Sequence, residues 1–171
     1  MPLHGKPWAR YISAMTSSDR DFAVAVGEEI ASDSRCFVCG LKNPGGLQVR
    51  FFRDGEQSAA ATYTPQDPFM GYHGLLHGGI TAALLDEIMI KAVLAQSKLV
   101  VTARMTVQYH RPIPLGQPLS LHGTVISQKA RLFETKGRIL NERGEKLASA
   151  TGTYVEVGES ERAELAESIG R

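Results

Sequence analysis

Residues 77–87 read HGGITAALLDE, and this stretch decides how the rest of the chain must fold. Two glycines open a predicted helix over residues 79–95 that is apolar on nearly every side, so we expect the helix to be buried. Glycines at a helix start leave backbone N–H groups open to a ligand, and the helix dipole favours negative charge there. Asp86 follows about two turns later, where a buried carboxylate needs a partner or a chemical task.

The positions of Asp86 and Glu87 on the helix predict different surroundings for the two carboxylates. At about 100° per residue, Asp86 projects among apolar side chains, whereas Glu87 and Lys91 project about 100–140° away. We expect Asp86 to face apolar surroundings and Glu87 to form an ordinary exposed pair with Lys91. The helix pattern alone also allows an Asp86 that only caps the helix or forms a local salt bridge. The adjoining glycines favour a site, because an oxyanion-binding helix start beside a carboxylate is the minimal set for hydrolysing an acyl group.

Strand patterns lie on both sides of this helix in the sequence. A hairpin is predicted from residues 47–52 and 57–63, joined at the tight-turn pair Asp54-Gly55, and a loop rich in proline and glycine covers residues 64–76. Four more strands are predicted after the helix, over residues 101–109, 119–127, 132–140 and 146–157. No other element can bury the helix, so an antiparallel sheet must cover it, which predicts an α+β fold.

The composition fits one domain with terminal extensions. The 171 residues carry a net charge of +1 and 43% are hydrophobic, so charge favours neither nucleic acid nor an anionic membrane as a partner. No apolar run reaches the roughly 18 residues of a membrane helix, and the first residues lack the apolar core of a signal peptide, so we expect a cytoplasmic protein. The expected parts are a partly helical extension at 1–34, with a helix over 19–30, a main domain at 35–157 and a charged tail at 158–171.

Cys36 and Cys39 form a C-x-x-C pair and are the only cysteines of the chain. The pair could be a redox couple, half of a zinc site or structural. A zinc site with His73 and His77 is disfavoured, because 33 residues separate Cys39 from His73, against about 12–15 in a zinc finger. A thioredoxin-like motif would begin a helix, whereas turn-forming residues follow here at 43–46. We therefore expect structural or incidental cysteines, and no metal or other cofactor.

The order and spacing of several motifs resemble the hotdog-fold thioesterases of the PaaI-like group, over residues 36–157. The motifs are CFVCG at residues 36–40 with Asn43-Pro44 and Gly46-Leu47, HGG at residues 77–79 followed by Asp86, and Tyr109 with Pro112, Pro114 and Gly116. The resemblance implies a curved antiparallel sheet wrapped around one long helix. It also implies a homodimer, or a dimer of dimers, with active sites at the dimer interface. The implied substrates are acyl groups in thioester linkage to coenzyme A, or sometimes to acyl carrier protein.

The resemblance further implies roles for individual residues. Asp86 would be the catalytic carboxylate, either as a general base that activates water or as a nucleophile. The backbone N–H of Gly78 would polarise the thioester carbonyl. Thr102 would hold the water or the carboxylate, and His77 would orient the loop or contact substrate; a plain strand threonine and a loop-packing histidine are the alternatives.

One position departs from the pattern of the family. Several relatives carry Asn or Gln six residues before the motif histidine, where this chain has Gly71. Tyr72 or His73 could replace that side chain, although His73 could equally be structural. We therefore place Gly71 and His73, together with Gly79, among the expected substrate-binding residues.

Two other functions stay open on the sequence. A hotdog hydratase or dehydratase would pair His77 with a carboxylate such as Asp86, and a non-catalytic acyl-CoA-binding module would keep the glycines without needing Asp86. The spacing from the glycines to Asp86 favours a thioesterase over a hydratase or dehydratase. The buried carboxylate favours a thioesterase over a non-catalytic binding module. The sequence contains no G-x-S-x-G, phosphate loop or dinucleotide fingerprint, so those classes are unsupported.

Overall fold

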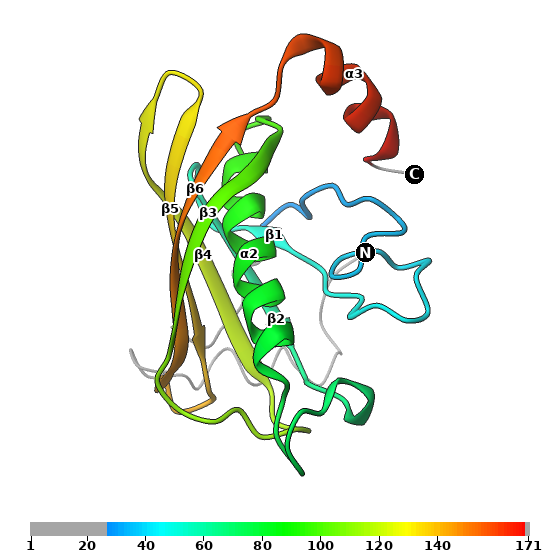
Figure 1. Cartoon of the computed structure of the whole chain (residues 1–171), viewed down its shortest axis with the longest axis vertical. Helices are drawn as coiled ribbons and strands as arrows, with labels where there is room; N and C mark the ends of the chain where they lie inside the picture. The colour runs from blue at the N-terminus through cyan, green and yellow to red at the C-terminus, as the bar shows by residue number, and fades with distance from the viewer. Residues whose placement is uncertain (1–26, 170–171) are drawn as a thin grey trace, which may run out of the picture.

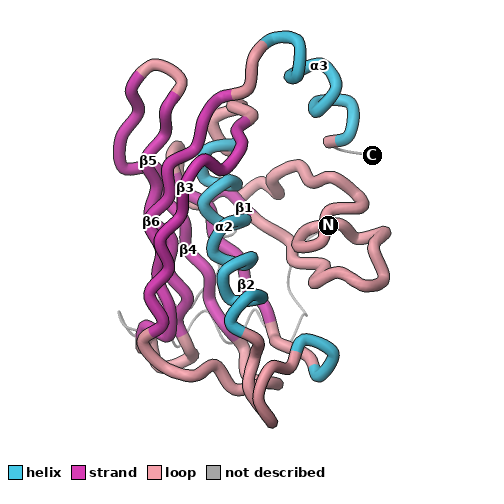
Figure 2. Tube along the Cα trace, in the orientation of Figure 1, coloured by secondary structure: helices cyan, strands magenta, loops and turns pink. Residues whose placement is uncertain are grey.

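A long helix, α2 (Gly78–Leu94), packs across one face of a six-stranded antiparallel sheet (Figures 1 and 2). The computed structural model describes residues 27–169. Along the sheet the strand order is β1-β2-β4-β5-β6-β3. The strands are β1 Phe52–Arg53, β2 Ser58–Tyr63, β3 Val100–Tyr109, β4 Leu119–Lys129, β5 Leu132–Leu140 and β6 Lys146–Glu156. A 3-10 turn, η2 (Asp67–Phe69), precedes α2, and α3 (Glu159–Ser168) follows β6. The predicted α+β architecture is confirmed.

Paired glycines in the middle of the sheet let α2 approach it closely. Gly123 of β4 lies opposite Gly137 of β5. A Cβ atom at Gly123 would lie 2.3 Å from the backbone oxygen of Ile88, and one at Gly137 would lie 3.0 Å from the side chain of Met89. Ile88 and Met89 are fully buried between helix and sheet, at a packing distance that only bare backbone allows.

Residues 27–51, here called the covering segment, lie over the side of α2 that faces away from the sheet (blue to cyan in Figure 1). Backbone hydrogen bonds run from the Leu47 N–H to the Phe37 oxygen and from the Val49 N–H to the Val38 oxygen. Its buried apolar side chains join the same core as the helix: Ile30, Val38, Cys39, Leu47, Val49 and Phe51. The prediction that the sheet alone buries the helix is therefore wrong, because a helix that is apolar all round needs a cover on both sides.

The covering segment also explains two local errors of the sequence prediction. The first strand of the predicted hairpin shrinks to β1, because residues 47–51 bond within the covering segment and not to β2. Of the predicted helix over residues 19–30, residues 19–26 lie outside the described residues. Residues 27–30 are not helical, and Glu29 bridges to Phe52 instead. Within residues 27–169, no helix is both long enough and apolar enough to cross a membrane.

Within residues 27–169, strand β3 forms one edge of the sheet and pairs only with β6. A β-bulge lies between Thr102 and Arg104 and shifts the register against β6. Strict alternation would place Thr102 on the face opposite Met105. The bulge places Thr102 on the helix side of the sheet, where Met105 and Val107 pack against the core. Bulges commonly re-aim a side chain in this way beside a functional site.

Candidate active site

Asp86 is held by two hydroxyl groups that come from different strands. Thr102 Oγ1 of β3 donates to Asp86 Oδ1 at 3.0 Å and lies 3.3 Å from Oδ2. The Tyr154 hydroxyl of β6 donates to the same Oδ1 at 2.9 Å. Tyr154 is fully buried and Thr102 is exposed, so the carboxylate is fixed from inside the core and opens toward the β3 edge. The structure thus brings together Asp86 and Thr102 as predicted, but the expected apolar surroundings of Asp86 are wrong on this side.

Tyr154 is the site residue that the sequence prediction missed. It lies on the inward face of β6, and a Cβ atom at Gly152 would come within 2.5 Å of its ring, so the glycine makes room for the phenol. Burial, together with the negative charge of Asp86, raises the pKa of Tyr154 above its usual value. The hydroxyl therefore stays a donor to the carboxylate. The only sequence signal was a tyrosine at an inward position of a strand otherwise lined there by small residues.

The start of α2 leaves one backbone N–H group without a partner in the described part of the chain. His77 is the N-cap, and its Nδ1 accepts a hydrogen bond from the Gly79 N–H at 2.9 Å. The next two amides, of Ile80 and Thr81, bond to the backbone oxygen of His77. Gly78 is exposed, and its N–H is the one first-turn amide left for a ligand.

The remaining predicted residues lie in the loop before α2. Gly71 packs against His77, because a Cβ atom at Gly71 would lie 3.0 Å from the His77 Cα. His73 lies in the same loop and is exposed. Tyr109, at the end of β3, donates its hydroxyl to the Gly78 oxygen at 2.9 Å and ties the helix start to the edge strand. Gly71 and His77 thus shape the helix start. The Gly79 N–H already donates to His77 Nδ1.

Asp86 and the Gly78 N–H do not meet within one chain. They are eight residues apart on one helix, which at 1.5 Å per residue is about 12 Å along its axis. A carbonyl held by the Gly78 N–H at about 3 Å could not also lie against Asp86 of the same chain.

On the opposite side of α2, Glu87 and Lys91 contact the covering segment. Their side chains are only 14% and 3% exposed and form an ion pair at 3.6 Å, so the prediction of an exposed pair is wrong. Lys91 Nζ donates to the Ala31 oxygen at 2.7 Å and to Ser32 Oγ at 3.1 Å. Glu87 points away from Asp86 as the helical geometry predicted, but the covering segment takes the place of water there.

The two cysteines of the covering segment lie next to Glu87, and not next to His73 and His77. Cys36 Sγ is 3.8 Å from Glu87 Oε2. The hydrogen bond from the Cys39 thiol, two backbone N–H groups and the charge of Lys91 lower the pKa of Cys36 to about 5, against the effect of burial. The same bond and burial raise the pKa of Cys39. Burial likewise raises the pKa of Glu87.

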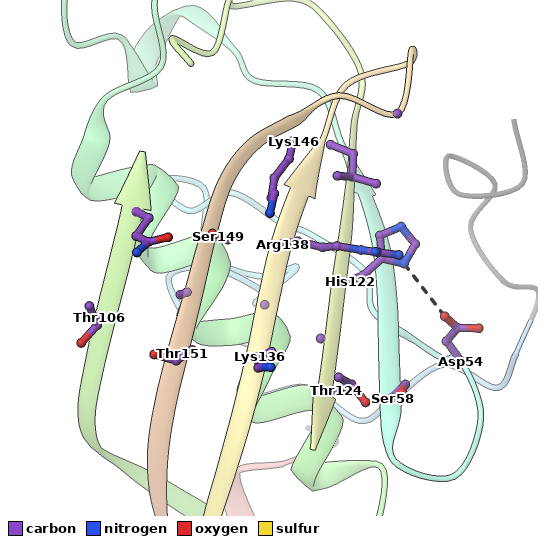
Figure 3. Close-up of a pocket in the computed structure, with 16 residues that line it drawn as sticks. Asp54, Ser58, Thr106, His122, Thr124, Lys136, Arg138, Lys146, Ser149 and Thr151 are labelled. Carbon is purple, nitrogen blue, oxygen red and sulfur yellow. Dashed lines mark hydrogen bonds and ion pairs between the residues drawn. The ribbon is translucent and has the colours of Figure 1, made fainter. Parts of the chain in front are cut away.

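A polar groove of about 770 Å³ lies on the outer face of the sheet, away from α2 (Figure 3). Lys136 and Arg138 of β5 point into it, and His122 of β4 lies 4.0 Å from Asp54 at its rim. None of the predicted site residues lines this groove. The candidate site is therefore the helix side of the β3 edge, and the groove is a separate surface.

Comparison with known proteins agrees with this geometry. Residues 73–148, which span α2, β3, β4, β5 and the first residues of β6, match the model of the thioesterase superfamily. Over these residues the chain is similar to the thioesterase superfamily. Acyl-coenzyme A thioesterase THEM4 of Bos taurus is 24% identical over 134 residues, which are 77% of this chain and 55% of THEM4. The chain thus spans about half the length of that relative.

Solved structures show the same fold. The thioesterase superfamily protein RHA08564 is 28% identical, with a TM-score of 0.69 over 91% of this chain and 82% of the other. The Escherichia coli PaaI protein is 23% identical, with a TM-score of 0.62 over 66% and 81% of the two chains. A hypothetical thioesterase protein of Streptococcus pneumoniae TIGR4, solved with coenzyme A, is 22% identical, with a TM-score of 0.61 over 64% and 89%. The resemblance to PaaI-like hotdog thioesterases is confirmed.

Proposed function

We propose that this protein hydrolyses acyl-CoA thioesters, at a site that two subunits share. Asp86 is the proposed catalytic carboxylate and the Gly78 N–H the proposed oxyanion donor. The observation that carries the proposal is the Asp86 carboxylate, fixed by Tyr154 and Thr102 and open at the β3 edge. Acyl groups on acyl carrier protein are the alternative substrate of this proposal. The proposed location is the cytoplasm.

The two hydroxyl donors make the two carboxylate oxygens of Asp86 unequal. Oδ1 accepts both short hydrogen bonds, so Oδ2 is the freer oxygen. In the general-base form, Oδ2 takes a proton from water as the water oxygen attacks the thioester carbon, and the Gly78 N–H stabilises the developing oxyanion. The tetrahedral intermediate then collapses, the carbon–sulfur bond breaks, and the leaving thiolate takes the proton held on Oδ2, which gives a free acid and CoA thiol. In the nucleophilic form, Oδ2 attacks the carbonyl carbon, the carbon–sulfur bond breaks and the thiolate leaves, and water then hydrolyses the resulting anhydride to the free acid and the Asp86 carboxylate.

A dimer resolves the separation of about 12 Å between the two groups of one chain. The ten-residue edge of β3 has no partner strand in the described chain, and Val101 and Tyr109 on it are 51% and 57% exposed. Long exposed edges invite strand pairing, and a two-fold axis repeats each contact. Pairing two β3 edges would carry the Gly78 N–H of one subunit toward Asp86 of the other. A dimer of dimers extends the same proposal.

Relatives support this assignment of substrate and residues. The Streptococcus pneumoniae protein was solved with coenzyme A, and a Streptococcus mutans protein was solved bound to acetyl CoA. The Streptococcus pneumoniae protein was also solved as an aspartate-to-alanine and as a threonine-to-alanine mutant, and the two positions are 16 residues apart. Asp86 and Thr102 are 16 residues apart as well.

Thiol release from a panel of short, medium, long and aromatic acyl-CoAs tests the proposal. Asp86→Asn should abolish most turnover, by about 10²–10⁴-fold for a lost general base, because the amide cannot take a proton. Glu142→Gln, an equivalent change at an exposed turn residue, is the matched control and should change the rate little. Near-full hydrolysis by Asp86→Asn with an unchanged melting temperature would contradict the assignment.

The hydratase alternative is disfavoured by the place of His77. Its Nδ1 accepts the hydrogen bond from the Gly79 N–H and caps the helix, so this ring nitrogen is already engaged. Accumulation of free thiol, without loss of enoyl absorbance from an enoyl-CoA, separates the two activities.

A further inference from the structure

Three potential metal ligands converge on the side of α2 that faces away from Asp86. Cys36 Sγ, Cys39 Sγ and a carboxylate oxygen of Glu87 lie within 4.8 Å of one another, and residues 27–169 contain no second such group. Cys36 Sγ and Glu87 Oε2 are 3.8 Å apart. A tetrahedral zinc ion with bonds of about 2.0–2.3 Å separates its ligand atoms by about 3.5–3.8 Å. The separation of Cys36 and Glu87 therefore matches that of two zinc ligands, and the third ligand atom lies within about an ångström of the required distance.

The backbone around Cys36 is folded to hold a thiolate. The N–H groups of Val38 and Cys39 donate to Cys36 Sγ at 3.3 and 3.5 Å, and the Gly40 N–H donates to the Cys36 oxygen at 3.0 Å. A Cβ atom at Gly40 would lie 2.5 Å from the Cys36 nitrogen and oxygen, so this tight turn requires glycine. Amides aimed at sulfur fix the first ligand before a metal arrives and lower the cost of ordering the site.

The charges of the metal-bound cluster would also balance. Once both thiols have lost their protons to a metal, they and the Glu87 carboxylate carry three negative charges, in a place where Cys39 is buried and the Glu87 side chain is 14% exposed. Lys91, 3% exposed and 3.6 Å from Glu87, supplies one positive charge. A dication supplies the other two, and buried charge is tolerated when it is paired or coordinates a metal. The same balance explains why a lysine lies beside a set of metal ligands.

We propose that Cys36, Cys39 and Glu87 bind one zinc ion, with a water molecule in the fourth tetrahedral position. On binding, each thiol that still holds a proton gives it to solvent and forms a thiolate–zinc bond. The ion would join the covering segment to α2 one residue after Asp86, on the other side of the helix. Its role is structural and independent of the proposed thioester hydrolysis, because the helix separates it from the proposed reaction site.

Metal content and spectroscopy test this site in the full chain. Protein purified in a zinc-containing, chelator-free buffer should hold about one zinc per chain by elemental analysis. Removal of the metal followed by addition of cobalt(II) should give thiolate-to-cobalt charge-transfer absorption and the strong visible bands of tetrahedral cobalt. Chelation should also lower the melting temperature, because the bound ion stabilises only the folded chain.

Variants identify the ligands. Cys36→Ser with Cys39→Ser should lose the metal and the charge-transfer absorption, and Glu87→Gln should bind zinc at least tenfold more weakly. Glu142→Gln, on the exposed turn between β5 and β6, should keep the full metal content. If the cysteine variant does not fold, the cobalt titration of the metal-free wild-type chain decides. A wild-type chain that shows no thiolate–cobalt absorption, or a cysteine variant that retains the metal, overturns the proposal.

Discussion

A proline at position 78 would delete the one hydrogen-bond donor that the proposed mechanism needs from α2. Gly78 is the first helical residue after the N-cap, where an N–H group has no partner within the helix and proline is favoured. His77 has ψ of 135°, within the range that a residue before proline adopts. A Cβ atom at Gly78 would meet only Tyr109, at 3.6 Å or more, which is ordinary contact. Gly78→Pro should therefore fold.

The expected effect on turnover follows from the loss of that N–H group. Removing one oxyanion-hole donor typically lowers kcat by about 10²–10³-fold. Stability should not fall, because a proline that fits its native backbone conformation adds about 0.4–1 kcal/mol through the unfolded chain. Thiol release from the best acyl-CoA of the panel gives kcat, and thermal unfolding gives the melting temperature. Gly78→Ala keeps the N–H and is the control; it should lose much less activity than Gly78→Pro.

Mixing this variant with Asp86→Asn shows whether the site is shared between subunits. If each site takes Gly78 from one subunit and Asp86 from the other, a mixed dimer has one site with both lesions and one intact site. Two inactive variants, unfolded and refolded together in equal amounts, should then recover about a quarter of the wild-type activity, since half of the dimers are mixed. Wild-type turnover by Gly78→Pro, or a mixture as inactive as its components, would refute the shared oxyanion site.

Four further expectations follow from the contacts described above. Tyr154→Phe should keep the fold and lower kcat by about 10- to 100-fold, since a hydrogen bond to a charged group contributes roughly 1.5–3 kcal/mol; an unchanged rate would remove Tyr154 from the site. Gly123→Ala should lower the unfolding free energy by about 1–3 kcal/mol in a denaturant titration, because its Cβ would press on the Ile88 backbone; unchanged stability would contradict the close packing of helix and sheet. Light scattering at micromolar concentration should give at least twice the chain mass of 18.6 kDa, and a monomer mass would contradict the shared site. Chelation below the melting transition should leave the rate of thiol release unchanged, because no proposed metal ligand takes part in the reaction.

The central helix and the strands could be predicted because their signals are local. Apolar residues on every side of residues 79–95 predicted burial, and alternation placed β5 at its observed bounds, Leu132–Leu140. The pairing of Asp86 with Thr102 was within reach only through the family resemblance. Strict alternation along β3 places Thr102 on the wrong face, and the bulge that corrects this leaves no mark in the sequence. Tyr154 was missed because its partner, Asp86, lies 68 residues away in sequence.

The covering segment could not be predicted because its contacts are neither periodic nor local. Residues 36–49 bond to one another across turns, so they show no strand or helix period. Cys36 meets Glu87 across 51 positions, and Lys91 meets Ala31 across 60. The sequence did contain one indirect sign. Apolar residues occupy nearly every side of the helix, so Glu87 and Lys91 alone could not make a solvent-facing side, and a cover over them was required.

The two neighbouring carboxylates of α2 illustrate how one helix can serve two separate structures. Successive residues project about 100° apart, so Asp86 reaches the strands β3 and β6 while Glu87 reaches the covering segment. Both are partly buried, and each is balanced differently: Asp86 by two neutral hydroxyl donors, Glu87 by the ammonium of Lys91 and the proposed cation. Neutral donors hold Asp86 in place without neutralising its charge, which suits a group that must accept a proton or attack a carbonyl. A cationic partner would compete for that same oxygen, so the positive charge lies on the side of the helix away from the proposed reaction.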